Sequence, residues 1–326
     1  MKNILTAACL LSLALPAARA ESPTELIAKV GDSLLVGYAR PLVESYAVAM
    51  GSGLFHSAKA HKLLGFDIGV RAMAIRIPTA GKTFRAKVKY CYFDPKFRDT
   101  VWVDTVIENA ATVFGKAGAD RIWIPEGAVG VPPGLPGGLD LDYMPFVVPQ
   151  ASIGLPVQGM EAMVRYIPWP FQGSTVNFLG LGLKEELTAL PGFKGLPFNL
   201  ALQGFYQQVQ IGNEMKSSTM GANAHASAGL SILTPYAGIG LASTSMKFDY
   251  EFKYQRPTGF DPGSQQVTFV DDSLAVKYNY SSGAQWRATI GISVNVFPLV
   301  IVNADYSRNL SSGYDAFTGG LSLAFR

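Results

Sequence analysis

Apolar and polar side chains alternate with a period of two residues along much of the chain. Across positions 286–296 the even-numbered residues are apolar, and the odd-numbered residues are polar or glycine. After Pro298 the alternation restarts over 299–308. Successive side chains of a β-strand point to opposite faces, so this pattern predicts strands. The uncharged stretch 288–304 therefore predicts two strands joined by a turn, not one transmembrane helix.

The same alternation recurs in four further segments, at 66–74, 179–184, 198–207 and 317–325. Transmembrane β-barrels show an apolar-out, polar-in pattern over about ten residues, with aromatic residues near both ends. A secreted β-sandwich also alternates and is the alternative fold. The second face here is rich in Gly, Ser, Asn and isolated charges, which favours a barrel. We therefore predict an all-β fold, a transmembrane antiparallel β-barrel.

The end of the chain and the number of alternating segments support a barrel. Phe325 follows apolar residues at alternating positions, and Arg326 comes directly after it. The pattern predicts fourteen strands, an even number as in bacterial barrels, with twelve as the alternative. They lie near 65–77, 83–93, 100–107, 146–155, 158–168, 174–187, 197–210, 217–231, 235–253, 265–270, 273–280, 285–297, 299–308 and 314–326.

We expect the first twenty residues to be a secretory signal peptide. Lys2 precedes an apolar stretch from 4 to 15, and Ala18-Arg19-Ala20 is a small-residue cleavage site. A lipoprotein interpretation would use Cys9, but the apolar stretch continues past it. Removal of residues 1–20 leaves Cys91 as the one cysteine, so no disulfide is expected within the mature chain.

A segment before the strands has a helical pattern instead. Ser22, Pro23 and Glu25 form a helix start, and apolar residues follow at helical spacing until Gly51. Pro41 predicts a kink or a second helical turn. This amphipathic helix could plug the barrel, lie on the inner leaflet or sit in the periplasm, and we expect a plug. The predicted organisation is a signal peptide at 1–20, a helical plug segment at 21–60 and a barrel at 61–326.

A second segment, about 110–148, also departs from the strand pattern. Between positions 122 and 149 it holds six Pro and five Gly among apolar residues. Loops this long are usually functional or disordered, and disorder would be more polar. We predict a hatch loop folded into the pore, with a floppy surface loop as the alternative. The expected hatch residues are Trp123, Pro132, Pro133, Gly137 and Gly138.

Composition excludes several other classes of protein. Only 16% of residues are charged although 48% are hydrophobic, and the mean hydropathy of +0.20 is too low for a helical membrane bundle. The apolar content excludes disorder. A formal charge of +3 gives no basis for nucleic-acid binding. A barrel explains these values, because each membrane strand has one apolar and one mixed face.

Several short motifs resemble a family of exported outer-membrane β-barrel proteins described only as a domain of unknown function. They are His61–Asp67, Thr112–Gly115, Gln150–Leu155, Glu161–Pro168, Leu196–Phe198 and Gln203–Tyr206. The resemblance spans about residue 25 to the end. It implies a location in the outer membrane of a Gram-negative-type cell, with outer-membrane lipid and the barrel-insertion machinery as partners. More loosely, the chain is similar to the outer-membrane channels for long-chain fatty acids and hydrocarbons, which implies small hydrophobic solutes.

Eight charged residues stand at polar positions of the predicted strands, and we take them as candidates for lining or gating the lumen. They are Asp67, Arg71, Glu161, Arg165, Lys184, Glu186, Arg287 and Asp305. A Lys or Arg facing lipid at mid-bilayer would cost about 2–4 kcal/mol, so these residues should face the lumen or an interface. They form either salt bridges between wall and plug or a polar track for a solute.

Three functions remain open at this stage. The leading hypothesis is a gated channel for small hydrophobic solutes. The first alternative is a structural or adhesive barrel with a closed lumen, and the second is an outer-membrane lipid hydrolase using His225 with Ser227 and Asn223. His56 and His61 lack further ligands at metal spacing. We expect a non-enzyme without cofactor or metal, and no nucleic-acid partner.

Overall fold

A computed structural model describes residues 31–94, 96, 99–116, 138–171, 174–193, 195–212, 215–261 and 266–325. The expected signal peptide at 1–20 and the predicted helix start at 22–25 lie outside the described residues.

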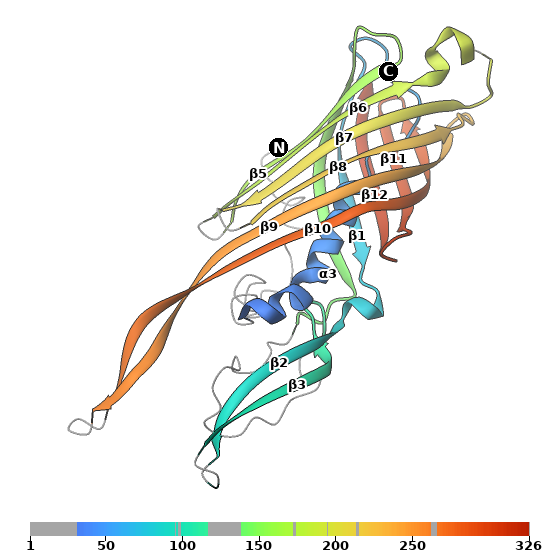
Figure 1. The fold of residues 1–326 in the computed structure, drawn as a ribbon. Coiled ribbons are helices and arrows are strands. Elements are labelled where there is room, and N and C mark those ends of the chain that lie inside the picture. Colours follow the sequence, from blue (N-terminus) through green and yellow to red (C-terminus); the bar gives the residue numbers. More distant parts are fainter. Residues whose placement is uncertain are drawn as a thin grey trace.

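Ten antiparallel strands close into a barrel (Figure 1). They are β1 (Phe66–Arg76), β4 (Tyr143–Gly154), β5 (Met160–Phe171), β6 (Ser174–Glu186), β7 (Asn199–Ile211), β8 (Met215–Ser227), β9 (Leu233–Asp261), β10 (Gln266–Phe297), β11 (Val300–Asn309) and β12 (Asp315–Phe325). The barrel closes at β1, which pairs with β12 on one side and with β4 on the other.

The strand count of fourteen, or twelve, is wrong for the barrel. The predicted strands at 265–270, 273–280 and 285–297 are parts of the single long strand β10. The predicted strands at 83–93 and 100–107 form β2 (Thr83–Asp94) and β3 (Asp99–Ala111), which pair with each other as a separate two-stranded sheet. Alternation identifies a strand, but it carries no information about which partner the strand pairs with.

The two ends of the barrel differ in shape. We call the end that holds Phe66 and Phe325 the turn end, because its connections are the segments 155–159, 187–198, 228–232 and 298–299. The opposite end, called the hairpin end, carries the β2–β3 hairpin and a ribbon made by 249–261 of β9 and 266–278 of β10 (Figure 1). Short 3₁₀ turns lie at Thr79–Gly81, Leu187–Ala189 and Pro191–Phe193.

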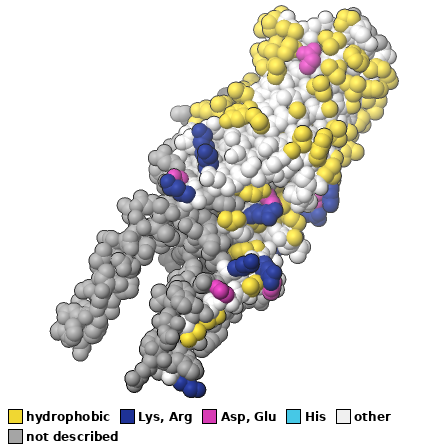
Figure 2. Space-filling view, in the orientation of Figure 1, with side chains coloured by type: hydrophobic (Ala, Val, Ile, Leu, Met, Phe, Trp, Pro, Cys, Tyr) yellow, Lys and Arg dark blue, Asp and Glu magenta, His cyan; other side chains and the backbone are white. Residues whose placement is uncertain are grey.

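The outer wall of the barrel is apolar and is bordered by charges. Apolar side chains at one parity are exposed, including Ile68, Leu181, Leu202, Ile290 and Leu321. Exposed charged residues on the barrel strands lie next to the hairpin end; they include Arg76, Lys216, Lys247 and Arg308. Figure 2 shows the apolar side chains gathered on the barrel beyond these charges. The predicted parity is therefore confirmed, for example by exposed Trp286 beside buried Arg287.

The inward side chains form two layers along the barrel axis. Near the hairpin end they are apolar and form one core with helix α3 (Gly31–Gly51); wall members of this core include Met73, Ile75, Phe178, Val209 and Met246. Towards the turn end most inward side chains are polar or charged, among them Asp67, Glu161, Lys184 and Asp305, with a small apolar cluster that includes Met163 and Phe205. The helix therefore closes the hairpin end with a hydrophobic core.

Helix α3 lies across the hairpin end, with its C-terminal part inside the barrel (Figure 1). Its buried residues Tyr38, Val43 and Met50 belong to the predicted apolar stripe. The helix continues through Pro41, where the Ser45 hydroxyl donates to the Pro41 carbonyl at 2.7 Å. No helix among the described residues is long and apolar enough to cross a membrane.

The predicted hatch loop is described only at its two ends. Trp123, Pro132, Pro133 and Gly137 lie outside the described residues, so their predicted place in the pore stays a prediction. Gly138 packs so closely against the Thr112 carbonyl that a Cβ atom would lie 2.2 Å from the oxygen. The Val113 amide donates to the Tyr38 carbonyl of α3, so this part of the loop lies at the hairpin end.

Candidate functional site

An irregular segment of the chain, residues 52–61, runs through the barrel lumen, and we call it the strap. It begins where α3 ends, at a turn in which Gly53 has φ +62°, a left-handed conformation that glycine adopts without strain. All strap residues from Ser52 to Ala58 are buried, as is His61. The strap then joins β1 through residues 62–65 at the turn end. The candidate site is this strap and the polar wall around it.

Polar wall residues hold the start of the strap and the C-terminus of α3. Gln207 Nε2 donates to the Met50 carbonyl at 2.6 Å, and Arg165 Nη2 donates to the carbonyls of Ser52 at 3.1 Å and Gly53 at 2.6 Å. The last turn of α3 contains no basic residue. The C-terminus of a helix carries partial negative charge, which nearby cations stabilise. The wall therefore supplies the cation that the helix sequence lacks.

Arg287 adds a second guanidinium at the same place. A Cβ atom on Gly51 would lie 1.7 Å from Arg287 Nη1, so the guanidinium packs directly over this glycine. Arg287 Nη2 donates to Asn223 Oδ1 at 2.9 Å, which fixes its orientation. Gly51 is thus needed for close contact between helix and wall.

The middle of the strap contacts the wall through an aromatic stack and a charged group. The Phe55 ring stacks on the His225 ring, with centroids 4.1 Å apart and an interplanar angle of 10°. The His56 ring lies between Arg71 Nη2, at 3.1 Å, and Asp67 Oδ2, at 3.4 Å. The strap is therefore held by packing as well as by hydrogen bonds.

A carboxylate centre holds the strap at the turn end. Glu161 Oε2 accepts from His61 through the backbone amide at 3.1 Å and lies 2.7 Å from His61 Nδ1. The same oxygen lies 2.9 Å from Lys184 Nζ, and this ammonium also donates to the Lys59 carbonyl at 3.3 Å. Glu186 accepts from the Ala60 amide at 2.8 Å. Two acidic residues thus hold the last peptide groups of the strap.

The strap's backbone polar groups bond mainly to wall side chains, not to other backbone. Besides the bonds above, the Leu54 carbonyl accepts from Gln203 and the His56 carbonyl accepts from Ser293, while the Ala58 amide donates to Ser227. Buried peptide groups without partners are costly, so these side chains supply the hydrogen bonds that regular secondary structure would otherwise provide.

All eight charged residues predicted to line or gate the lumen are buried inside the barrel. Four carry positive charge and four carry negative charge, so the set is balanced. Six of them contact the strap directly: Asp67, Arg71, Glu161, Arg165, Lys184 and Glu186. Asp305 accepts from Tyr236 at 3.0 Å. Their role in gating or in guiding a solute stays a prediction.

The three residues of the proposed hydrolase site each contact another part of the barrel interior. Asn223 donates to Gln203 and accepts from Arg287. Ser227 binds the strap, and His225 lies against Phe55. Each of the three thus has a structural partner, and a role in catalysis stays a prediction. Within the described ranges, no cluster of three or more His, Cys, Asp or Glu could hold a metal ion.

Several residues that hold the strap were missed by sequence reasoning. Gln203 and Ser293, which bind the strap, and Gln207, which binds the end of α3, stand at inward positions, and the period-two pattern alone could have identified them. The course of residues 52–61 had no comparable signal. This stretch is rich in Ser, Gly and Ala and has neither a helical nor a strand period.

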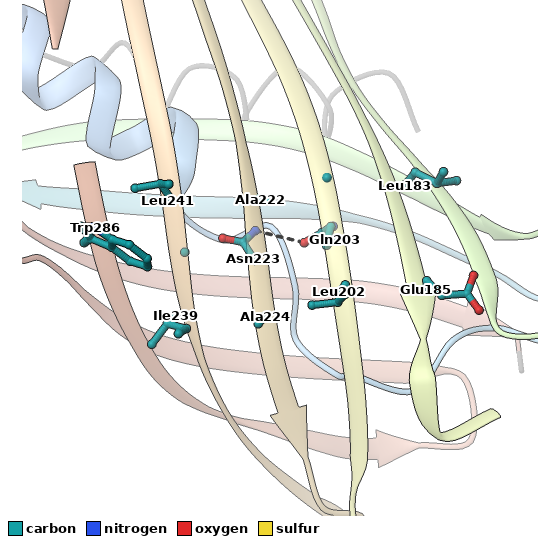
Figure 3. Close-up of a pocket in the computed structure, with 12 residues that line it drawn as sticks. Leu183, Glu185, Leu202, Gln203, Ala222, Asn223, Ala224, Ile239, Leu241 and Trp286 are labelled. Atoms are coloured by element: carbon teal, nitrogen blue, oxygen red, sulfur yellow. Dashed lines mark hydrogen bonds between the residues drawn. The ribbon is translucent and has the colours of Figure 1, made fainter. Parts of the chain in front are cut away.

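A shallow groove of about 410 Å³ lies on the outside of the wall, away from the strap (Figure 3). Leu202, Ile239 and Trp286 border it, and small residues such as Ala222 and Ala224 form its floor. Behind the floor, Asn223 donates to Gln203 at 3.3 Å, as the dashed line in Figure 3 shows. The groove is a feature of the apolar outer surface.

The chain belongs to the family of unknown function DUF6588, whose sequence profile matches residues 1–325. This match confirms the family resemblance that the sequence motifs indicated. No curated protein matches the chain at a significant level.

Solved outer-membrane barrels have similar structures at low sequence identity. The protease OmpT of Escherichia coli is 10% identical with a TM-score of 0.37, and the match covers 80% of this chain and 97% of OmpT. The attachment invasion locus protein Ail of Yersinia pestis is 8% identical with a TM-score of 0.26, covering 81% and 99%. OprG of Pseudomonas aeruginosa is 10% identical with a TM-score of 0.26, covering 82% and 98%. At these scores the likenesses carry no functional argument.

Proposed function

We propose that the protein is an outer-membrane β-barrel whose lumen is closed by its own strap and which acts through the hairpins that project from one end. The closed barrel abolishes strand edges, and its exposed wall is apolar and is bordered by charges at the hairpin end, as suits a bilayer. The barrel is then an anchor, and the β2–β3 hairpin and the β9–β10 ribbon are the parts free to meet a partner. This is the structural or adhesive alternative.

The observation that carries the proposal is the way the strap is held in the lumen. Wall side chains from six strands bind it, including Arg165 on β5, Gln203 on β7, Ser227 on β8 and Ser293 on β10. The hairpin end is filled by the apolar core around α3. A solute would have to replace all these contacts, so the structure favours a closed lumen over an open path.

A gated channel is the second candidate, and the chemistry of the wall changes its expected solute. The strap is bound by side chains only, so its displacement would leave the wall intact. The uncovered surface would include Arg71, Arg165 and Arg287, which is unsuited to an apolar solute. An opened lumen would therefore pass small polar solutes, and the predicted hydrophobic solutes gain no support from the lumen.

Liposome swelling tests the closed lumen. Liposomes holding the purified protein should swell in sugar solutions no faster than protein-free liposomes. A variant lacking residues 31–60 should swell faster, because the polar wall is uncovered, and its heat-modifiable migration on gels would show that the barrel has folded. Swelling with the intact protein would contradict the proposal and favour the channel.

A further inference from the structure

Helix α3 and the strap together span the barrel from one end to the other. The C-terminus of α3, where the strap begins, is held at mid-wall by Gln207, below the apolar core around α3. The last residue of the strap, His61, binds Glu161, which lies beside the first residue of β5 at the turn end. The N-terminal half of α3 lies beyond the hairpin end, where Gly37 packs against Phe84 of β2. The chain therefore enters the barrel at the hairpin end and leaves it at the turn end.

The shape of the two ends indicates which faces the outside of the cell. Transmembrane barrels have short periplasmic turns and longer extracellular loops. The turn end has the two-residue connection 298–299 and both ends of the barrel sequence, Phe66 and Phe325. The hairpin end carries the β2–β3 hairpin and the projecting ribbon. The hairpin end is thus the extracellular end.

Two features stop the strap from sliding in either direction. Towards the hairpin end it is tied to β1, because the Gly154 amide on β4 donates to the Gly65 carbonyl at 2.8 Å just before β1 begins. Towards the turn end it is tied to α3, and a helix about 10–12 Å wide cannot follow through a lumen already filled by side chains. Withdrawal would need either β1 to leave the wall or α3 to unfold.

We propose that the strap runs through the barrel from the extracellular end to the periplasmic end and is locked there, with the N-terminal half of α3 as a stopper on the outside and β1 as the anchor at the periplasmic end. This rests on the outer-membrane location of the proposed function. It places the exposed face of α3, with Val36 and Arg40, on the cell surface. It also requires that β1 pairs with β12, and so closes the barrel, after the strap is already in place.

Cysteine labelling on intact cells tests this topology. In a Cys91→Ser background, Val36→Cys places a thiol on the exposed face of α3. The matched control is Val157→Cys, also exposed but in the connection between β4 and β5 at the turn end. Both are treated with a membrane-impermeant maleimide before and after permeabilisation of the outer membrane. Val36→Cys should label equally in both conditions, and Val157→Cys only after permeabilisation.

Other outcomes overturn the inference in distinguishable ways. Labelling of Val157→Cys but not Val36→Cys in intact cells would invert the orientation, with the membrane location retained. Protection of both thiols until permeabilisation would place α3 on the periplasmic side. Absence of the protein from the outer-membrane fraction would overturn the proposed function itself.

Discussion

Arg165 on β5 donates to the carbonyl oxygen of Gly53 at 2.6 Å, a bond between residues 112 positions apart in the chain. The Arg165 side chain is fully buried, and its Nε also donates to Gln150 on the neighbouring strand β4. This one guanidinium therefore connects two wall strands to the strap just after α3 ends. It is the point at which barrel, strap and helix are most directly coupled.

Replacing Arg165 should weaken the closed state. Arg165→Met removes charged donors from two strap carbonyls and from Gln150, so we expect a loss of about 3 kcal/mol in the free energy of unfolding. The control Arg40→Met removes an exposed pair with Glu44 and should change stability by less than about 1 kcal/mol. Urea unfolding followed by tryptophan fluorescence measures both, and equal effects would contradict the role of Arg165.

The aromatic stack should matter as much as the hydrogen bonds. Phe55→Ala leaves a cavity beside His225 and should destabilise the protein by about 3–5 kcal/mol. Phe193→Ala, at a 45% exposed position near the turn end, is the matched control and should have little effect. A small effect of Phe55→Ala in the same unfolding measurement would show that the strap does not pack tightly in the lumen.

The carboxylate at the turn end should hold the strap's last residues. Glu161→Gln keeps the size of the side chain but removes the charge that Lys184 and His61 share, leaving the buried ammonium without its partner. We expect about 3 kcal/mol of destabilisation. Glu108→Gln, which changes an exposed pair with Arg85, should be nearly neutral. A stable Glu161→Gln variant would show that the centre is dispensable.

The outer wall should tolerate no charge at the middle of the bilayer. Ile290 on β10 is 65% exposed and faces outward, so Ile290→Arg should cost about 2–4 kcal/mol in a lipid bilayer. Leu310→Arg places the same charge in the turn between β11 and β12 and should be tolerated. If Ile290→Arg folds in lipid vesicles as well as the wild type, this face does not meet lipid.

The alternation along the chain predicted which side chains face in and which face out, because a strand has a strict period of two. It placed Arg287 inward and Ile290 outward, as observed. The same alternation did not predict the number of barrel strands. The strands β2 and β3 alternate as barrel strands do, and their separation is decided by contacts with α3 and by pairing. A single sequence shows neither.

The strap was hidden for a different physical reason. Its irregular course is set by partners far away in the chain, such as Glu161 for His61 and Ser227 for Ala58. Local propensity of residues 52–61 carries no trace of those contacts. The sequence identified the eight candidate charged residues because a charged side chain on a membrane strand is costly when it faces lipid. Such a side chain is therefore expected to face the lumen.

A disulfide between strap and wall tests the central claim most directly. Ser57 Oγ lies 3.5 Å from Ser227 Oγ, so a Ser57→Cys/Ser227→Cys variant in the Cys91→Ser background should form a disulfide in the outer membrane of intact cells. The control pair Ser57→Cys/Ser217→Cys uses an inward residue ten positions away on β8, about 33 Å along the strand, and should not form one. Mass spectrometry of the folded protein measures both. A disulfide in the first pair only is the predicted result, whereas free thiols in the first pair of a folded barrel would contradict a strap-filled lumen.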